Sequence, residues 1–113
     1  MGRRHSKTMD LRAQLSQAIE AGQMEQALDL YELIEKQKPD EPRWSHRKGD
    51  LLRRMGRQAD AVRAYERAVE LYAARGFEAR AVATAKLMLA IDPSRGELLE
   101  QVEPEAAFIG PVF

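Results

Sequence analysis

Apolar residues recur three and four positions apart through most of the chain, and no stretch alternates with a period of two for long. This spacing places apolar side chains along one side of an α-helix, so the pattern predicts an all-α fold. Residues that end or start helices interrupt the pattern at Gly22, at Pro39 and Pro42, at Gly56, at Gly76 and at Pro93. The segments between these breaks predict helices at residues 10–21, 24–37, 42–55, 59–75 and 77–91.

The predicted connections are short, which makes consecutive helices antiparallel neighbours and the chain a series of stacked helical hairpins. After Pro93, the residues Ser94 and Glu97 match a capping box and predict a short sixth helix. Pro104 and Pro111 prevent the segment after this sixth helix from forming a helix. The predicted organisation is a basic leader at 1–8, a helical array at 9–93, a capping helix at 94–102 and an extended apolar tail at 103–113.

An internal repeat appears when the segment that begins GQMEQALDLY is aligned with the segment that begins GRQADAVRAY. Three pairs align at an offset of 34 residues (56 minus 22), namely Gly22 with Gly56, Ala27 with Ala61 and Tyr31 with Tyr65. The period and the Ala-x-x-x-Tyr pattern resemble the tetratricopeptide repeat over residues 8–93. This resemblance implies a short α-solenoid.

The third unit is shorter, because Ala81 follows Ala61 by only 20 residues (81 minus 61). No separate first helix fits in that interval. The predicted helix at 59–75 therefore serves twice, as the second helix of one repeat and the first helix of the next. The array then contains two and a half repeats, and helix 77–91, which is apolar nearly all round, has to be covered on several sides.

Composition narrows the function classes. The 113 residues fit one small domain, and 18 basic residues balance 18 acidic ones, so the molecule has no net field to attract nucleic acid or membrane. There is no cysteine, and the longest nearly apolar run, AVATAKLMLAI, is interrupted by Lys86 and is too short to cross a bilayer. Abundant Arg and Ala without any Asn favour a bacterial source. We expect a cytoplasmic protein with no membrane span.

Sequence motifs for catalysis, metal binding or cofactor binding do not appear. Ser16 and Ser45 have no neighbouring base, and the only other histidine beside His46 is His5 in the leader. We therefore expect no enzyme, no metal and no cofactor. Trp44 opens a predicted helix, where an indole fills the interior of a hairpin, so we expect it in the core.

The resemblance implies a protein-interaction scaffold or adaptor that binds a peptide or a partner's helix along the inner face of its first helices. Carried over on the Gly22 and Gly56 register, the groove positions are Arg12, Ser16 and Ile19, followed by Arg43, His46, Asp50, Arg53 and Arg54. This set is mixed but mainly basic, so the expected partner is an acidic peptide held by guanidinium groups.

Two alternatives stay open. In the first, the apolar tail residues Phe108, Ile109, Val112 and Phe113 dock onto the chain's own array, a neighbour's array or another assembly, with helix 77–91 as the receiving surface of a homo-oligomer. In the second, which is disfavoured, the basic cluster between Arg43 and Arg67 binds nucleic acid. Arg43, Arg47 and Arg54 share one side of their helix, but Lys48 and Arg53 diverge from it, so the cluster does not form one surface.

Overall fold

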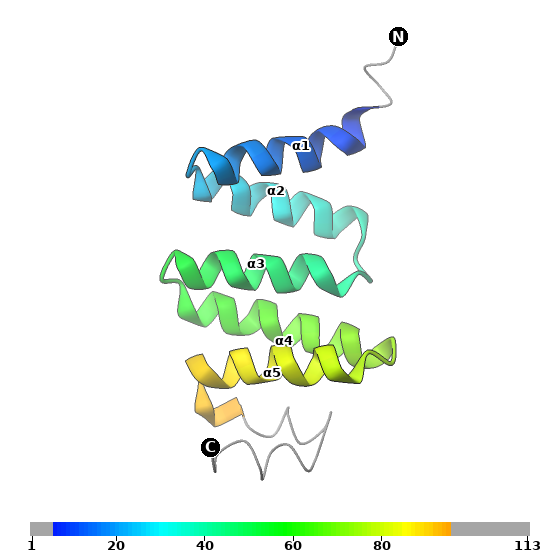
Figure 1. The fold of residues 1–113 in the computed structure, drawn as a ribbon, viewed down its shortest axis with the longest axis vertical. Coiled ribbons are helices and arrows are strands. Elements are labelled where there is room, and N and C mark those ends of the chain that lie inside the picture. The colour runs from blue at the N-terminus through cyan, green and yellow to red at the C-terminus, as the bar shows by residue number, and fades with distance from the viewer. Residues whose placement is uncertain (1–5, 96–113) are drawn as a thin grey trace.

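The computed structural model describes the backbone of residues 6–95 and the side chains of residues 11–95. This part of the chain is all-α. The helices are α1 (Ser6–Glu20), α2 (Met24–Gln37), α3 (Pro42–Arg54), α4 (Gln58–Ala74) and α5 (Glu78–Ile91), followed by the short 3₁₀ helix η1 (Pro93–Arg95). Consecutive helices lie side by side and alternate in direction, so each forms an antiparallel pair with the next (Figure 1). The five predicted helices are confirmed, and only the start of α1 differs by more than one residue.

Three of the helix connections have the same conformation. Gly22, Gly56 and Gly76 have φ angles of 72°, 78° and 78°, a region in which a side chain is strained but glycine is not. The residue after each glycine donates its backbone N–H back into the preceding helix, from Gln23 to Ala18 at 2.8 Å, from Arg57 to Leu52 at 2.9 Å and from Phe77 to Tyr72 at 2.9 Å. These bonds are those of a Schellman motif, which ends a helix and lets the next begin at once.

The other junctions use proline and aspartate. Pro42 occupies the first turn of α3, where its missing N–H has no partner to lose. After α5, the Asp92 carboxylate accepts hydrogen bonds from the backbone N–H and the hydroxyl of Ser94, at 3.1 and 2.6 Å. The Ser94 hydroxyl therefore bonds to Asp92, which lies two residues earlier at the end of α5. Residues 96–102 of the predicted capping helix lie outside the described part of the chain.

The core is built around α4, which packs against α3 on one side and α5 on the other. Ala27, Ala61 and Tyr65 are completely buried, and Tyr31 is 6 % exposed, so the residues that carry the repeat pattern do fill the helix contacts. A second cluster joins Ala68, Val69 and Tyr72 of α4 to Ala81 and Ala85 of α5. The small side chains of α5 let its axis approach α4 closely.

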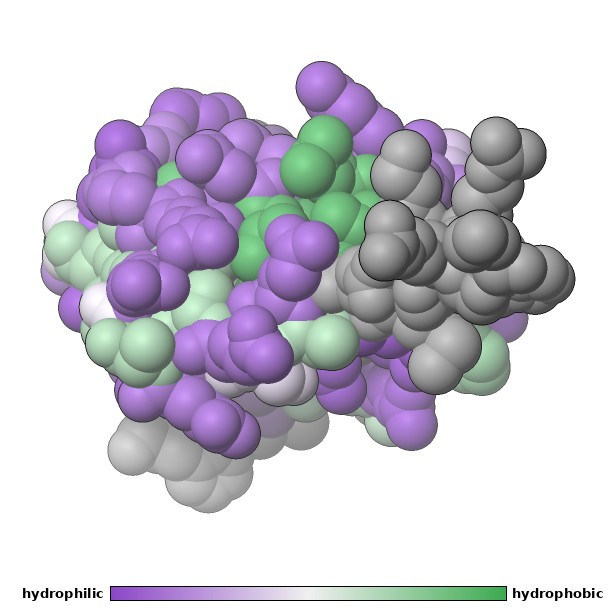
Figure 2. Space-filling model, turned by 90° about the horizontal axis from the view of Figure 1, so that it is seen from above, coloured by the Kyte–Doolittle hydropathy of each residue, from purple (hydrophilic) through white to green (hydrophobic). Residues whose placement is uncertain are grey.

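Polar side chains cover most of the surface around α1. Figure 2 looks down on this end of the molecule and shows one group of hydrophobic residues among hydrophilic ones. The large hydrophobic side chains that stay exposed in the described part are Ile19, Leu33 and Phe77. Between residues 6 and 95, no helix is both long enough and apolar enough to cross a membrane.

Candidate functional site

Three arginines from two helices meet around the indole of Trp44. Arg12 of α1 and both Arg43 and Arg47 of α3 place their guanidinium carbons 5.3, 5.0 and 5.4 Å from the centroid of the ring. These distances are within the range of a cation–π interaction. Trp44 itself is only 3 % exposed, which confirms its predicted place in the core. The structure thus brings together two predicted groove residues, Arg12 and Arg43, that lie 31 positions apart in the sequence (43 minus 12).

Glu41, the residue before α3, forms hydrogen bonds with two residues of this cluster. It accepts hydrogen bonds from the indole nitrogen of Trp44 at 3.0 Å and from Nε of Arg43 at 3.2 Å. Desolvation alone would raise the pKa of Glu41, but the Trp44 hydrogen bond and the charge of Arg43 outweigh it, and the pKa lies below its ordinary value. Glu41 is therefore ionised at neutral pH and neutralises one of the guanidinium groups.

The predicted ligand positions His46 and Asp50 are engaged within the protein. The His46 ring lies edge-on between the rings of Tyr65 and Tyr72, with both centroids 5.9 Å away. Its Nδ1 is 3.2 Å from the Tyr72 hydroxyl and 3.3 Å from the Thr84 hydroxyl, and its Nε2 is 3.8 Å from the Asp50 carboxylate. Tyr65 donates a hydrogen bond of 2.5 Å to Asp50. This network joins α3 to α4 and α5.

Tyr31 and the network residue Tyr65 both have a raised pKa, and the charges of nearby arginines oppose each shift. Burial raises the pKa of Tyr31, and the charges of Arg47 and Arg54 oppose the shift. Burial and the hydrogen bond to Asp50 raise the pKa of Tyr65, and Arg53 opposes that shift. Arg47, Arg53 and Arg54 therefore lie within electrostatic range of buried phenols.

The basic surface continues to the turn between α4 and α5. Arg75 and Arg80 join Arg43 around a hollow of about 150 Å³ that Phe77 also lines. The Phe77 ring is 47 % exposed, and the Arg80 guanidinium lies 5.8 Å from its centroid. We call this surface the basic face and define it by the exposed residues Arg12, Arg43, Arg47, Arg75 and Arg80. The sequence prediction missed Arg75, Phe77 and Arg80, because they follow a different hairpin turn.

The remaining predicted positions are less closely tied to this face. Ser16 and Ile19 are exposed on α1, and the contacts around Trp44 reach α1 through Arg12. The tail residues Phe108, Ile109, Val112 and Phe113 lie outside the described part of the chain.

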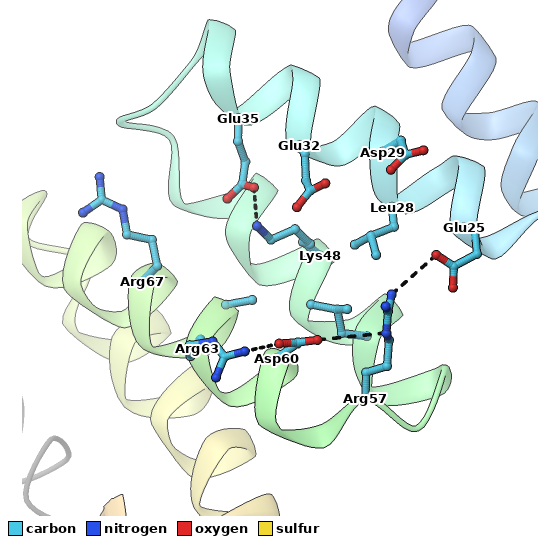
Figure 3. Close-up of a pocket in the computed structure, with 12 residues that line it drawn as sticks. Glu25, Leu28, Asp29, Glu32, Glu35, Lys48, Arg57, Asp60, Arg63 and Arg67 are labelled. Carbon is cyan, nitrogen blue, oxygen red and sulfur yellow. Dashed lines mark hydrogen bonds and ion pairs between the residues drawn. The ribbon is translucent and has the colours of Figure 1, made fainter.

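A second groove, between α2 and α4, has a different character (Figure 3). One wall carries the α2 carboxylates Glu25, Asp29, Glu32 and Glu35, the opposite wall carries Arg57, Asp60, Arg63 and Arg67, and the cavity has a volume of about 470 Å³. Lys48 of α3 lies at its floor and pairs with Glu35 at 2.6 Å. Arg57 pairs with Glu25 at 3.5 Å, and Arg63 pairs with Asp60. Most of the charge in this groove is thus neutralised internally.

The basic cluster between Arg43 and Arg67 is therefore divided between two surfaces. Arg43 and Arg47 belong to the basic face, whereas Lys48 and Arg67 line the α2–α4 groove. As predicted, Lys48 lies on a different side of α3 from Arg43 and Arg47. A continuous track for a nucleic-acid backbone requires these charges on one side, and this arrangement does not provide it.

Within the described part of the chain, no three His, Asp or Glu side chains are placed to hold a metal ion. A comparison with protein-family models gave no match, and a comparison with curated proteins gave none either.

Proposed function

We propose that this protein is a non-catalytic interaction module, built like a short tetratricopeptide-repeat scaffold, that binds an acidic peptide or helix of another protein on the basic face. The observation that carries this proposal is the convergence of Arg12, Arg43 and Arg47 on the buried ring of Trp44. Their guanidinium groups come from two helices and lie around one aromatic ring.

The charge balance of the two surfaces supports this choice. Within residues 11–95, Arg43 is the one arginine of the basic face that has an ion-pair partner, whereas the α2–α4 groove contains an ion pair at each of Glu25, Glu35 and Asp60. Guanidinium groups without a carboxylate partner can donate paired hydrogen bonds to the carboxylates of a ligand. Stacking on an aromatic ring fixes their position beforehand, which lowers the entropic cost of binding.

The aromatic residues of the basic face define the ligand further. Phe77 exposes its ring beside Arg75 and Arg80, at the edge of the hollow that Arg43 also lines. An apolar or aromatic side chain of the ligand can bury surface there while neighbouring carboxylates bind the guanidinium groups. The favoured ligand is therefore an acidic segment that also carries aromatic residues.

The test uses a dye-labelled synthetic peptide of repeated Glu-Glu-Phe units and fluorescence anisotropy. We expect the variant Arg43→Gln/Arg47→Gln to bind roughly tenfold more weakly or worse, because each charged hydrogen bond contributes about 1.5–3 kcal/mol. The matched control is Arg63→Gln/Arg67→Gln, which removes the same charge from the α2–α4 groove and should leave the affinity unchanged. Equal losses in both variants would show that the peptide responds to total charge, and the basic face would not be its site.

The same assay separates this proposal from nucleic-acid binding. A labelled single-stranded oligonucleotide is also a polyanion, and the proposed site should bind it more weakly than the peptide. If the oligonucleotide binds more tightly than the peptide, and its affinity falls steeply with added salt, nucleic acid is the ligand and the peptide proposal is wrong.

A further inference from the structure

The chain carries its own acidic, aromatic segment beyond the last described residue. Residues 96–113 contain the glutamates Glu97, Glu100, Glu103 and Glu105, contain no Lys or Arg, and include Phe108 and Phe113. This is the composition that the basic face favours in a ligand. The formal net charge of +0 for the whole chain conceals this separation between a basic face and an acidic segment.

We propose that residues 96–113, which we call the acidic segment, occupy the basic face of their own chain and compete there with the partner peptide. This inference rests on the proposed function, because it assigns a resident occupant to the same site. Its consequence is regulatory, since a partner has to displace the acidic segment before it binds.

The acidic segment is long enough for its carboxylates to reach the part of the basic face on α3. The described chain ends at Arg95, which is anchored to α4 by an ion pair of 2.6 Å with Glu66. The 18 residues that follow (113 minus 95) span at most roughly 60 Å when extended. Glu103 and Glu105, eight and ten residues after Arg95 (103 minus 95 and 105 minus 95), reach at most roughly 30 and 35 Å, whereas α3 is two helices away from α5, or about 20 Å at about 10 Å for each helix.

Charge complementarity selects the basic face over the other surfaces. In the α2–α4 groove, three of the four basic residues already pair with carboxylates of the groove, and its five acidic residues outnumber those four, so it offers little attraction to a segment that has only negative charges. On the basic face, the glutamates meet Arg43 and Arg47, and a phenylalanine ring can lie beside Phe77 and Arg80 at the turn between α4 and α5. The apolar residues of the segment and its carboxylates are thus accommodated on one surface.

Trp44 provides a built-in reporter for this contact. It is the one tryptophan of the chain, and three guanidinium groups of the basic face lie against its ring. Carboxylates that bind these arginines change the charge next to the indole and therefore its emission. A comparison of full-length proteins that differ only in the acidic segment reads this change directly.

The experiment compares the full chain with the variant Glu97→Gln/Glu100→Gln/Glu103→Gln/Glu105→Gln. We expect the variant to bind the Glu-Glu-Phe peptide roughly tenfold more tightly, because an occupied site lowers the apparent affinity by the fraction that is free. We expect its Trp44 emission to differ from that of the unchanged chain at every protein concentration. The control variant Glu25→Gln/Asp29→Asn/Glu32→Gln removes carboxylates from α2 and should change neither quantity.

Three other outcomes would contradict the inference, the proposed function or the assignment to the same chain. If the peptide binds both chains with the same affinity, the acidic segment does not occupy the face and this inference is overturned, while the proposed function stands. If the peptide binds neither chain, the proposed function itself fails. If the emission difference appears only at high protein concentration, together with a doubled mass in light scattering, the occupant is the segment of a second copy and the assignment to the same chain is wrong.

Discussion

The ring of Tyr65 lies so close to the backbone of Gly49 that a Cβ atom added at residue 49 would be 2.7 Å from two of its ring carbons. Gly49 is in the middle of α3 and Tyr65 is on α4, so the two helices are in close contact here. Tyr65 is completely buried, and its hydroxyl is held by Asp50. The ring therefore has no room to move away from a larger residue.

The substitution Gly49→Ala should destabilise the protein although alanine favours helix formation. Alanine gains about 1 kcal/mol of helix propensity over glycine. Overpacking against a fixed ring costs about 1–3 kcal/mol, so we expect a net loss of up to about 2 kcal/mol in the free energy of unfolding. Urea denaturation followed by circular dichroism measures it.

A double-mutant cycle identifies the cause of that loss. In a background with Tyr65→Val, which removes the ring, the change at Gly49 should cost nothing or should stabilise the helix. If Gly49→Ala costs the same in both backgrounds, the Tyr65 ring is not responsible, and the packing argument is wrong.

The turn glycines should respond to substitution for a different reason. No atom lies within 4 Å of a Cβ built at Gly56, so its φ of +78° alone makes a side chain unfavourable there. We expect Gly56→Ala to cost roughly 1–2 kcal/mol and Gly56→Asn to cost less, because asparagine adopts this conformation more readily. Thermal unfolding of the two variants tests the order. An equal loss for both would indicate that the cost arises from something other than the left-handed backbone.

Alkaline pH should unfold the protein through its buried tyrosines. Burial is the main cause that raises the pKa of Tyr31, Tyr65 and Tyr72 above the ordinary value of about 10, and in Tyr65 the hydrogen bond to Asp50 adds to it. The native state thus keeps protons that the unfolded state releases. Their stabilising contribution is complete below pH about 10 and is lost as the pH rises beyond it.

Tyrosinate absorbance and helical circular dichroism measured in one alkaline titration test this linkage. The two signals should change together, above pH about 10, because the tyrosines ionise when the helices unfold. Tyrosinate absorbance that rises with a midpoint near 10 while the helical signal is intact would show that the phenols are not protected by the fold.

Local signals in the sequence were sufficient for the helices. Gly22 and Gly56 permit the left-handed backbone that each of these turns needs, and Pro42 favours the start of a helix, so each break is determined by the residues that make it. Ala27 and Ala61 occupy equivalent positions 34 residues apart (61 minus 27), because each has to fit at a close contact between helices. Gly49 gave no such signal, because its function depends on the Tyr65 ring of another helix.

The candidate site was harder to predict, since it is assembled from α1, α3 and the turn after α4. Periodicity correctly placed Arg43 and Arg47 on one side of α3, but it could not show that Arg12 lies over the same indole. It also could not show that His46 and Asp50 bond to tyrosines of α4. The spacing of residues along one helix shows which of them share a face. It does not show which residues of the other helices pack against that face.

The junction between α2 and α3 depends on a single carboxylate, that of Glu35. It accepts a hydrogen bond of 2.7 Å from the Ser45 hydroxyl and pairs with Lys48 at 2.6 Å. Ser45 is only 2 % exposed, so without Glu35 its hydroxyl would remain buried without this partner. An unsatisfied buried polar group costs about 1–3 kcal/mol, and we expect Glu35→Ala to lose that amount in urea denaturation.

The control is the exposed pair between Glu25 and Arg57 in the same groove, with side chains 76 % and 44 % exposed. Solvent screens such a pair, so Glu25→Ala should change the free energy of unfolding by less than about 0.5 kcal/mol. Adding Ser45→Ala to the Glu35→Ala variant should recover part of the loss, because it removes the unpaired hydroxyl. If Ser45→Ala instead adds its full cost to that of Glu35→Ala, the two residues act independently, and the α2–α3 junction does not depend on their hydrogen bond.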